Sequence, residues 1–273
     1  MIIAQLSDTH IRDGHDEAGI RLQQAVEHVL SLPALPDVVF VTGDCTEHGT
    51  ATEYARFREL LRPLTMPVYV LPGNHDQRAE LQGVFGAQGT QAMADYVQFV
   101  VDAGPLRLIG LDTHVPGQDG GLLDEARLQW LEARLQEAPE RPTLLFMHHP
   151  PFLTGLKAYD DMGLAGAEAF AAIIARHPQV ALITAGHVHA AMQRAFHGAL
   201  AITCPSTMHQ LLADYRETER LHVVSDAPAC LLHTWHPVAG VLTHTSPIAS
   251  SARPVGEVYD GQQWLMPPRP VTR

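Results

Sequence analysis

Five short apolar runs, each followed directly by polar side chains, constrain the fold of this chain more than any other feature. The run at 67–71 leads into Pro72-Gly73-Asn74-His75-Asp76, and four others lead into the polar groups at 8–10, 43–44, 148–150 and 186–189. Uninterrupted apolar runs are typical of buried parallel strands. Because α/β proteins place their chemistry at the carboxyl ends of such strands, the runs predict one functional site. One polar group at the end of one run would be equally consistent with a tight turn. Five such groups, each at the end of an apolar run, are hard to explain as turns alone.

The order of the segments predicts an α/β fold. Strand patterns at 2–6, 37–42 and 67–71 alternate with helical patterns at 20–32 and 50–61, the second opened by Thr50 and Glu53 as a capping box. Right-handed crossovers place such strands side by side and parallel. The remaining predictions are helices over 79–85 and 167–177, a helix capped by Asp124, an antiparallel pair at 96–101 and 107–111, buried strands at 143–147 and 180–184, and antiparallel strands at 200–203, 229–234 and 241–245.

The sequence predicts one domain with a tail. The chain has 273 residues without an internal repeat or a clear linker, so we assign 1–245 to a single domain. Residues 246–273 carry prolines at 247, 254, 267, 268 and 270. We expect this extension to be irregular and to pack on the domain or on a subunit partner.

The charge balance limits the classes of partner. Against 30 Asp and Glu there are 18 Lys and Arg, a formal net charge of -12. Such a surface repels nucleic acids and anionic membranes, so an anionic substrate needs a local positive centre, which bound cations supply. The start has no basic segment of a signal peptide and no apolar run reaches about 20 residues, which predicts a cytoplasmic protein. Three widely spaced cysteines, at 45, 204 and 230, indicate buried packing and no disulfide framework.

The polar tips together supply a set of metal donors. Phosphate-ester chemistry on a metal needs hard oxygens and borderline nitrogens that converge on one point, with positions left open for water and substrate. Taken singly, an Asp-x-His or a His-x-His pair is more often structural, and only one of the adjacent His148 and His149 needs to bind. Taken jointly, the candidate ligands are Asp8, His10, Asp44, Asn74, His148, His187 and His189.

These motifs resemble those of a known family. Five segments are similar to the five ordered motifs of the calcineurin-like metallophosphoesterases: Asp8-Thr9-His10, Gly43-Asp44-Cys45-Thr46-Glu47, Gly73-Asn74-His75-Asp76, His148-His149-Pro150 and Gly186-His187-Val188-His189. The resemblance covers residues 2 to about 190. Further likeness around Ser7, Met147 and Pro205-Ser206-Thr207-Met208-His209-Gln210 resembles the bacterial branch of class III cyclic-nucleotide phosphodiesterases and glycerophosphodiester phosphodiesterases.

The resemblance implies a fold and a set of roles. The family fold is a four-layer αββα sandwich with two mixed sheets. Two divalent cations, drawn from Fe, Mn, Zn or Co, are expected in the site. His75 is expected to contact the substrate phosphate and to protonate the leaving oxygen, and Asp76 to orient His75. The implied ligands are Asp8, His10 and His189 for one cation, Asn74, His148 and His187 for the other, and Asp44 as the bridge.

The expected reaction is hydrolysis of a small phosphodiester. Two cations about 3.5–4 Å apart lower the pKa of a shared water, so that a hydroxide attacks phosphorus in line with the ester oxygen. Few basic residues adjoin the site in sequence, with Arg12, Arg78 and Lys157 the nearest, which favours a monoanionic diester over a dianionic monoester. His209 is a candidate second-sphere substrate contact, with a structural role as the equal alternative, and Asp112 and His114 can also face the cleft.

Several alternatives remain open within the sequence. The diester is a glycerophosphodiester or a 3',5'-cyclic nucleotide, and a phosphomonoesterase or a nuclease uses the same chemistry. A non-catalytic scaffold with this fold would be expected to have lost some of its metal ligands. No ligand position in this sequence is replaced by a residue that does not bind metal. By resemblance, we expect a homo-oligomer, a dimer or larger, that acts on a small molecule and has neither a nucleic-acid nor a membrane partner.

Overall fold

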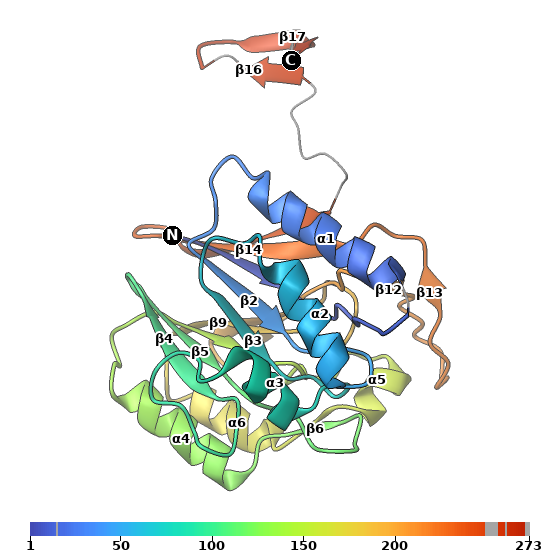
Figure 1. The fold of residues 1–273 in the computed structure, drawn as a ribbon. Helices are drawn as coiled ribbons and strands as arrows, with labels where there is room; N and C mark the ends of the chain where they lie inside the picture. The colour runs from blue at the N-terminus through green and yellow to red at the C-terminus, as the bar shows by residue number, and fades with distance from the viewer. Residues whose placement is uncertain (15, 249–255, 260, 271–273) are drawn as a thin grey trace.

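Two β-sheets packed face to face form the centre of the molecule, shown in the computed structural model of Figure 1. The structure describes residues 1–14, 16–248, 256–259 and 261–270. The first sheet has the order β15 (Gly240–Pro247), β14 (Ala229–His236), β1 (Ile2–Leu6), β2 (Val38–Thr42) and β3 (Val68–Leu71). The second has the order β10 (Gln193–Phe196), β11 (Ala199–Thr203), β9 (Val180–Ala185), β7 (Thr143–Phe146), β5 (Leu106–Gly110) and β4 (Phe99–Ala103).

Helices cover the outer face of each sheet. The helices α1 (Asp16–Leu30) and α2 (Ala51–Leu61) lie over the first sheet, and α4 (Glu125–Gln136) and α6 (Ala167–Ile174) lie over the second (Figure 1). The shorter helices are α3 (Arg78–Phe85) and α5 (Lys157–Asp161). Together with the two sheets, these helices make the four-layer αββα sandwich that the family resemblance implied.

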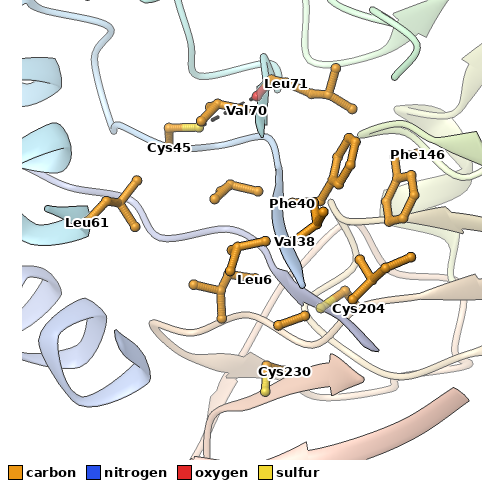
Figure 2. Close-up of a cluster of buried hydrophobic side chains, with 14 of the residues drawn as sticks. Leu6, Val38, Phe40, Cys45, Leu61, Val70, Leu71, Phe146, Cys204 and Cys230 are labelled. Carbon is orange, nitrogen blue, oxygen red and sulfur yellow. Dashed lines mark hydrogen bonds between the residues drawn. The ribbon is translucent and has the colours of Figure 1, made fainter. Parts of the chain in front are cut away.

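The apolar runs are uninterrupted because the second sheet is buried on both faces. Alternate residues of β7 separate cleanly: Leu144 and Phe146 belong to the core that the two sheets share, whereas Leu145 packs with α4 and α6. Successive side chains of a strand point to opposite faces, so a doubly covered strand needs apolar residues at every position. Phe40 of β2 stacks on Phe146 with ring centroids 4.0 Å apart and joins the sheets (Figure 2).

Most predicted elements form close to their predicted bounds. The capping box at Thr50 is present, Asp124 caps α4, and β4 and β5 pair in antiparallel fashion. The helix predicted from 20 begins earlier, at Asp16, because two acidic residues can open its first turn. The strand at 199–203 was predicted to be antiparallel; it is antiparallel to β10 but parallel to β9, so that prediction was wrong for one neighbour. The three cysteines are buried and free, as predicted.

The predicted irregular tail instead contains a hairpin. The strands β16 (Gly256–Tyr259) and β17 (Trp264–Pro270) pair with each other as a two-stranded antiparallel sheet. Pro254 of the predicted extension lies outside the described residues. Two further small sheets join β6 (Gly121–Leu122) to β8 (Leu164–Ala165) and β12 (Gln210–Leu211) to β13 (Val223–Val224). Among the described helices, none has the length and apolar character to cross a bilayer.

Candidate metal centre

The predicted site residues follow strands that run in the same direction. The strands β1, β2 and β3 are parallel in the first sheet, and β7 and β9 are parallel in the second. Their carboxyl ends therefore lie at one edge of each sheet. Because the sheets pack face to face, the loops that follow these five strands meet, and all seven candidate ligands lie in those loops.

The backbone is strained at the residues that form the site. Asp8, His10, Asp44, His187 and His189 all have positive φ, between 46° and 71°. Left-handed backbone is uncommon for residues other than glycine and collects at functional sites, where the surrounding structure enforces it. All five strained residues are proposed ligands in the loops at the edge where the strands end.

Two glycines let the loops approach closely enough to share that space. A Cβ at Gly73 would lie 2.2 Å from Asp44 Oδ1, and a Cβ at Gly43 would lie 2.4 Å from His148 Nδ1. Either contact would push a proposed ligand away from the centre. Glycine is therefore required at both positions by the packing of the site itself.

One group of donors comes from β1 and β9. His189 Nε2 lies 3.4 Å from Asp8 Oδ1 and 3.2 Å from His10 Nε2. The three donor atoms of this group lie within 4.8 Å of one another, so the group can hold a metal ion. All three side chains are buried.

Asp44 connects this group to a second one. Its Oδ2 lies 3.7 Å from His10 Nε2, whereas its Oδ1 lies 3.4 Å from His148 Nε2. His148 Nε2 also lies 3.0 Å from Asn74 Oδ1. The two carboxylate oxygens thus face two different donor sets, which is the placement that a bridging ligand needs.

Hydrogen bonds fix the tautomers of the site histidines. His10 Nδ1 faces Glu47 Oε2 at 3.0 Å, His189 Nδ1 faces the His209 carbonyl oxygen at 2.9 Å, and His148 Nδ1 faces the Thr42 carbonyl oxygen at 2.8 Å. Carbonyl and carboxylate oxygens only accept hydrogen bonds, so each Nδ1 carries a proton. In the neutral rings of His10 and His189, each Nε2 then presents a lone pair, whereas His148 Nε2 also faces the Asn74 amide oxygen, which only accepts, and so carries a proton when no metal is bound.

The consequence is an excess of lone pairs at the centre. His10 Nε2 and His189 Nε2 lie 3.2 Å apart, and two lone pairs at that distance repel unless a proton or a metal ion lies between them. His187 adds a further donor, because its Nε2 is buried without a hydrogen-bond partner among the described residues. Its backbone N–H donates to both oxygens of Asp8, at 3.1 and 3.2 Å. Imidazole nitrogens and carboxylate oxygens are the donors that Zn, Fe and Mn accept, so the residues present fit a metal centre.

The carboxylates and imidazoles of the centre also shift one another's pKa in the metal-free chain. Burial raises the pKa of Asp44, but the charges of His148 and His10 outweigh it and hold the pKa well below its ordinary value. Burial lowers the pKa of His148, but Asp44 raises it more, to about 9. Burial, followed by the charge of His149, holds the pKa of His187 well below its ordinary value. A neutral His187 is ready to donate its nitrogen, whereas His148 must first lose a proton.

The two adjacent histidines have different surroundings. His148 faces Asn74 and Asp44, whereas both ring nitrogens of His149 are used elsewhere, by Thr113 Oγ1 at 2.8 Å and the Asp119 carbonyl oxygen at 3.0 Å. His149 is therefore a buried support for the loop after β5. Donor atoms of His148, His149 and His187 lie within 4.8 Å of one another, and the partners of His149 favour His148, the choice that the family resemblance implied, as the ligand.

His75 lies at the rim of the centre. Its imidazole is about one third exposed and packs edge-on against His10, with ring centroids 5.0 Å apart. Its backbone N–H donates to Asp44 Oδ1, and its Nδ1–H donates to the Glu47 carbonyl oxygen, each at 3.0 Å. His209 lies close by, its ring 4.6 Å from that of His189.

Asp76 does not have the position expected for orienting His75. Its buried carboxylate accepts hydrogen bonds from the backbone N–H groups of Gly73, Cys45 and Thr46, at 2.9 to 3.2 Å. The Tyr54 hydroxyl donates a further one at 2.8 Å. Within the described part of the chain, no hydrogen bond joins Asp76 to the His75 ring. The residue instead ties the loop after β2 to the loop after β3, and its orienting role was predicted wrongly.

Asp112 is also structural. Arg78 donates two hydrogen bonds to its carboxylate, at 2.6 and 3.0 Å, which removes both residues from substrate binding. His114, the other residue considered for the cleft, donates from Nδ1 to the Gly73 carbonyl oxygen at 3.0 Å. It therefore supports the loop that carries Asn74.

Two residues near the site were given no role from the sequence. Glu47 lies in the motif that begins at Gly43, and it contacts both His10 and His75. Tyr159 of α5 packs edge-on against His187, with ring centroids 5.5 Å apart, and its buried hydroxyl has no hydrogen-bond partner among the described residues. No sequence signal marks Tyr159, because α5 has only five residues.

Comparisons with known proteins agree with the fold and the motifs. The family model described as calcineurin-like phosphoesterase matches residues 1–191. A protein named probable glycerophosphodiester phosphodiesterase GpdQ, from Arcobacter nitrofigilis, is 35% identical over 93% of this chain and 96% of its own. A 3',5'-cyclic adenosine monophosphate phosphodiesterase, CpdA from Pseudomonas aeruginosa, is 32% identical over 77% of each chain. The solved structure of a dimetal phosphatase from Danio rerio superposes with a TM-score of 0.71 at 15% identity, covering 91% of this chain and 96% of that one, and supports the fold.

Proposed function

The chain belongs to the calcineurin-like phosphoesterases, and we propose that it is a dinuclear metal-dependent phosphodiesterase that hydrolyses small phosphodiesters. The observation that carries the proposal is the convergence of imidazole lone pairs and carboxylate oxygens on one buried space. Without cations, such an arrangement leaves like partial charges facing one another. With two divalent cations of the Fe, Mn, Zn or Co class, every donor has a partner.

The ligand assignment divides the donors into two sets with one bridge. The distances within the Asp8, His10 and His189 group support the first set, and the contacts of His148 with Asn74 support the second. His187 joins the second set, because its ring lies 5.1 Å from that of His148 and its Nε2 is free of protein partners among the described residues. Asp44, with one oxygen towards each set, is the bridge.

The chain's own residues account for much of the reaction. When bound, the two cations supply Lewis acidity and lower the pKa of water in the site. His75 keeps its Nδ1 proton on the Glu47 carbonyl oxygen, so its Nε2 is the atom that can carry a proton to the leaving alkoxide. His209, beside His189, can contact an ester substituent. Asp76 and Arg78 hold the loop that carries Asn74 and His75 and exchange no proton with the substrate.

The surroundings favour a diester over a monoester. Arg78 is committed to Asp112, and Lys157 is paired with Asp161 and Glu219. Of the three basic residues nearest the site in sequence, only the exposed Arg12 has no ion pair among the described residues. A dianionic monoester would need a free cationic side chain to balance its second charge, whereas a monoanionic diester does not. The GpdQ protein resembles this chain over nearly its whole length, so glycerophosphodiesters are the favoured substrates and 3',5'-cyclic nucleotides are the alternative.

Turnover by protein with added metal tests the proposed function. The metal-free chain is incubated with Mn, Zn or Co and assayed on bis(p-nitrophenyl) phosphate, with Asp44→Asn as the control that removes the bridging charge. We expect metal-dependent hydrolysis that the control lacks. Competition between glycerophosphoethanolamine, cyclic AMP and a simple monoester then ranks the substrates. Absence of any metal-dependent hydrolysis would refute the proposal and favour a scaffold.

Two further expectations belong with this proposal. By family resemblance we expect a homo-oligomer, which light scattering of the purified chain measures. The cytoplasmic location expected from the sequence stays a prediction, which fractionation of the producing cell tests.

A further inference from the structure

We propose that Glu47 is a positioning residue that holds His10 and His75 together and strengthens cation binding at the Asp8, His10 and His189 group. The inference rests on the proposed function, because it concerns the metal centre described above. It adds a role for a residue outside the seven proposed ligands. Its basis is the pair of contacts that Glu47 makes, one through its side chain and one through its backbone.

The backbone around Glu47 is fixed against β1. The Glu47 N–H donates to the Ile11 carbonyl oxygen at 2.9 Å, and Ile11 forms a parallel bridge with Thr46. The loop after β2 therefore runs alongside the loop after β1. This register brings the Glu47 side chain beside His10, three residues away from Asp44 in sequence.

The carboxylate of Glu47 determines which nitrogen of His10 faces the centre. Glu47 Oε2 lies 3.0 Å from His10 Nδ1 and can only accept a hydrogen bond from it. The His10 proton is thus held on Nδ1, and Nε2 is turned towards Asp44 and His189. A carboxylate behind a ligating imidazole fixes its orientation and raises its basicity, and loss of such a partner typically weakens metal binding 10–100-fold.

The backbone of the same residue acts on His75. The Glu47 carbonyl oxygen accepts a hydrogen bond from His75 Nδ1 at 3.0 Å, while Glu47 Oε1 lies 4.0 Å from that nitrogen. Because the first contact is made by the backbone, a substitution of Glu47 retains it. Substitution of Glu47 therefore separates the role of its side chain from the role of its backbone. A Glu47 variant should lose the hydrogen bond to His10 Nδ1 and keep the backbone hydrogen bond that fixes the tautomer of His75.

The carboxylate of Glu47 meets His10 at the edge of the site. The side chain is about 31% exposed, so water satisfies the part that His10 does not contact. A residue with this exposure contributes little to the core, which makes its substitution a clean test.

The test measures cation affinity. Glu47→Gln keeps the size of the side chain and removes its charge, and Glu47→Ala removes the contact altogether. Both are made in an Asn74→Ala background, so that the second cation is weakened and a calorimetric titration of the metal-free chain with Mn reports on the first. We expect affinity to fall about 10–100-fold for Glu47→Ala and by a smaller factor for Glu47→Gln. The matched control is Glu59→Gln, an exposed glutamate of α2 that pairs with Arg62.

The outcomes separate this inference from the proposed function. Thermal melts of the metal-free variants should match that of the parent chain, which excludes a general loss of folding. If both Glu47 variants bind the first cation within about twofold of the parent, the positioning role is refuted while the proposed function stands. If the parent chain itself binds no cation, the proposed function is refuted, and this inference with it.

Discussion

Asn74 is the one neutral oxygen donor among the proposed ligands, which gives it a distinct role. Its Oδ1 lies 3.0 Å from His148 Nε2, so it belongs to the second set of donors. We predict that Asn74→Ala lowers the affinity of the second cation at least about tenfold while the first stays bound, because one ligand of one set is lost. Metal analysis after dialysis measures this as a fall from two ions per chain towards one. Retention of both ions would contradict the assignment.

His75 should affect the rate and not the metal content. Its ring lies at the rim, and its Nε2 is free to carry a proton, whereas its Nδ1 is held by Glu47. We predict that His75→Ala keeps both ions and lowers kcat about 10²–10⁴-fold, the usual contribution of a positioned general acid. A leaving group with a low pKa, such as p-nitrophenolate, should reduce the loss. Loss of both ions in this variant would assign His75 to the ligands instead.

Tyr159 provides a prediction about the metal-free protein. Its hydroxyl is buried and, among the described residues, has no hydrogen-bond partner, and an unsatisfied buried polar group costs about 1–3 kcal/mol. Tyr159→Phe removes only that hydroxyl, so we predict that the metal-free chain becomes more stable by up to about 1 kcal/mol. Urea denaturation measures the change. A clear destabilisation would show that the hydroxyl does have a partner in solution.

At the scale of elements, α2 anchors the loop that carries Asp44 and Glu47. Thr50 Oγ1 accepts from the Glu53 N–H at 3.2 Å, and Glu53 Oε2 accepts from the Thr50 and His48 N–H groups at 3.3 and 2.9 Å. The capping box therefore holds both the start of the helix and the end of the loop.

Removal of this cap should lower stability. We predict that Thr50→Ala reduces the free energy of unfolding by about 1 kcal/mol, the usual cost of a lost N-cap. The matched control is Thr52→Ala, at an exposed position inside the same helix, which should be neutral or slightly stabilising because alanine favours helices. Chemical denaturation of the two variants compares them. Equal effects would mean that the capping contacts contribute nothing.

Local patterns could predict the strands and caps but not every pairing or contact. The continuous apolar runs identify β7 and β9 because such strands are buried on both faces. The pairing of β11 could not be inferred, because its direction relative to β9 depends on the path of the chain through β10. The hairpin of β16 and β17 was missed because proline is unfavourable in most strands, although it is tolerated where no ladder hydrogen bond is needed.

The same limit explains which site residues were found. The seven candidate ligands follow strands with clear patterns, and parallel strands deliver their ends to one edge. Asp76 could not be placed, because its partners come from two loops and from Tyr54. Glu47 was given no role for a related reason: its contact with His10 depends on the register between two loops, which no local pattern contains.

At the scale of the whole molecule, the two sheets and their cores are already built by residues that come before the hairpin. Among the residues whose burial the structure describes, the buried apolar residues of both cores extend from Ile3 to Ile248, and β15, the last strand of the first sheet, ends at Pro247. The hairpin of β16 and β17 forms a separate two-stranded sheet. We therefore propose that the catalytic domain folds without residues 249–273 and that the extension serves a contact between subunits.

Truncation after Ile248 tests this division. We predict that the shortened chain melts within about 5 °C of the full chain and keeps its metal content, because both sheets, their helices and every proposed ligand remain. Light scattering of the two proteins measures the second half of the proposal: the full chain should be the larger assembly and the truncated chain the smaller one. A shortened chain that is insoluble or melts far lower would show that the extension belongs to the domain. Equal assemblies would refute its role between subunits.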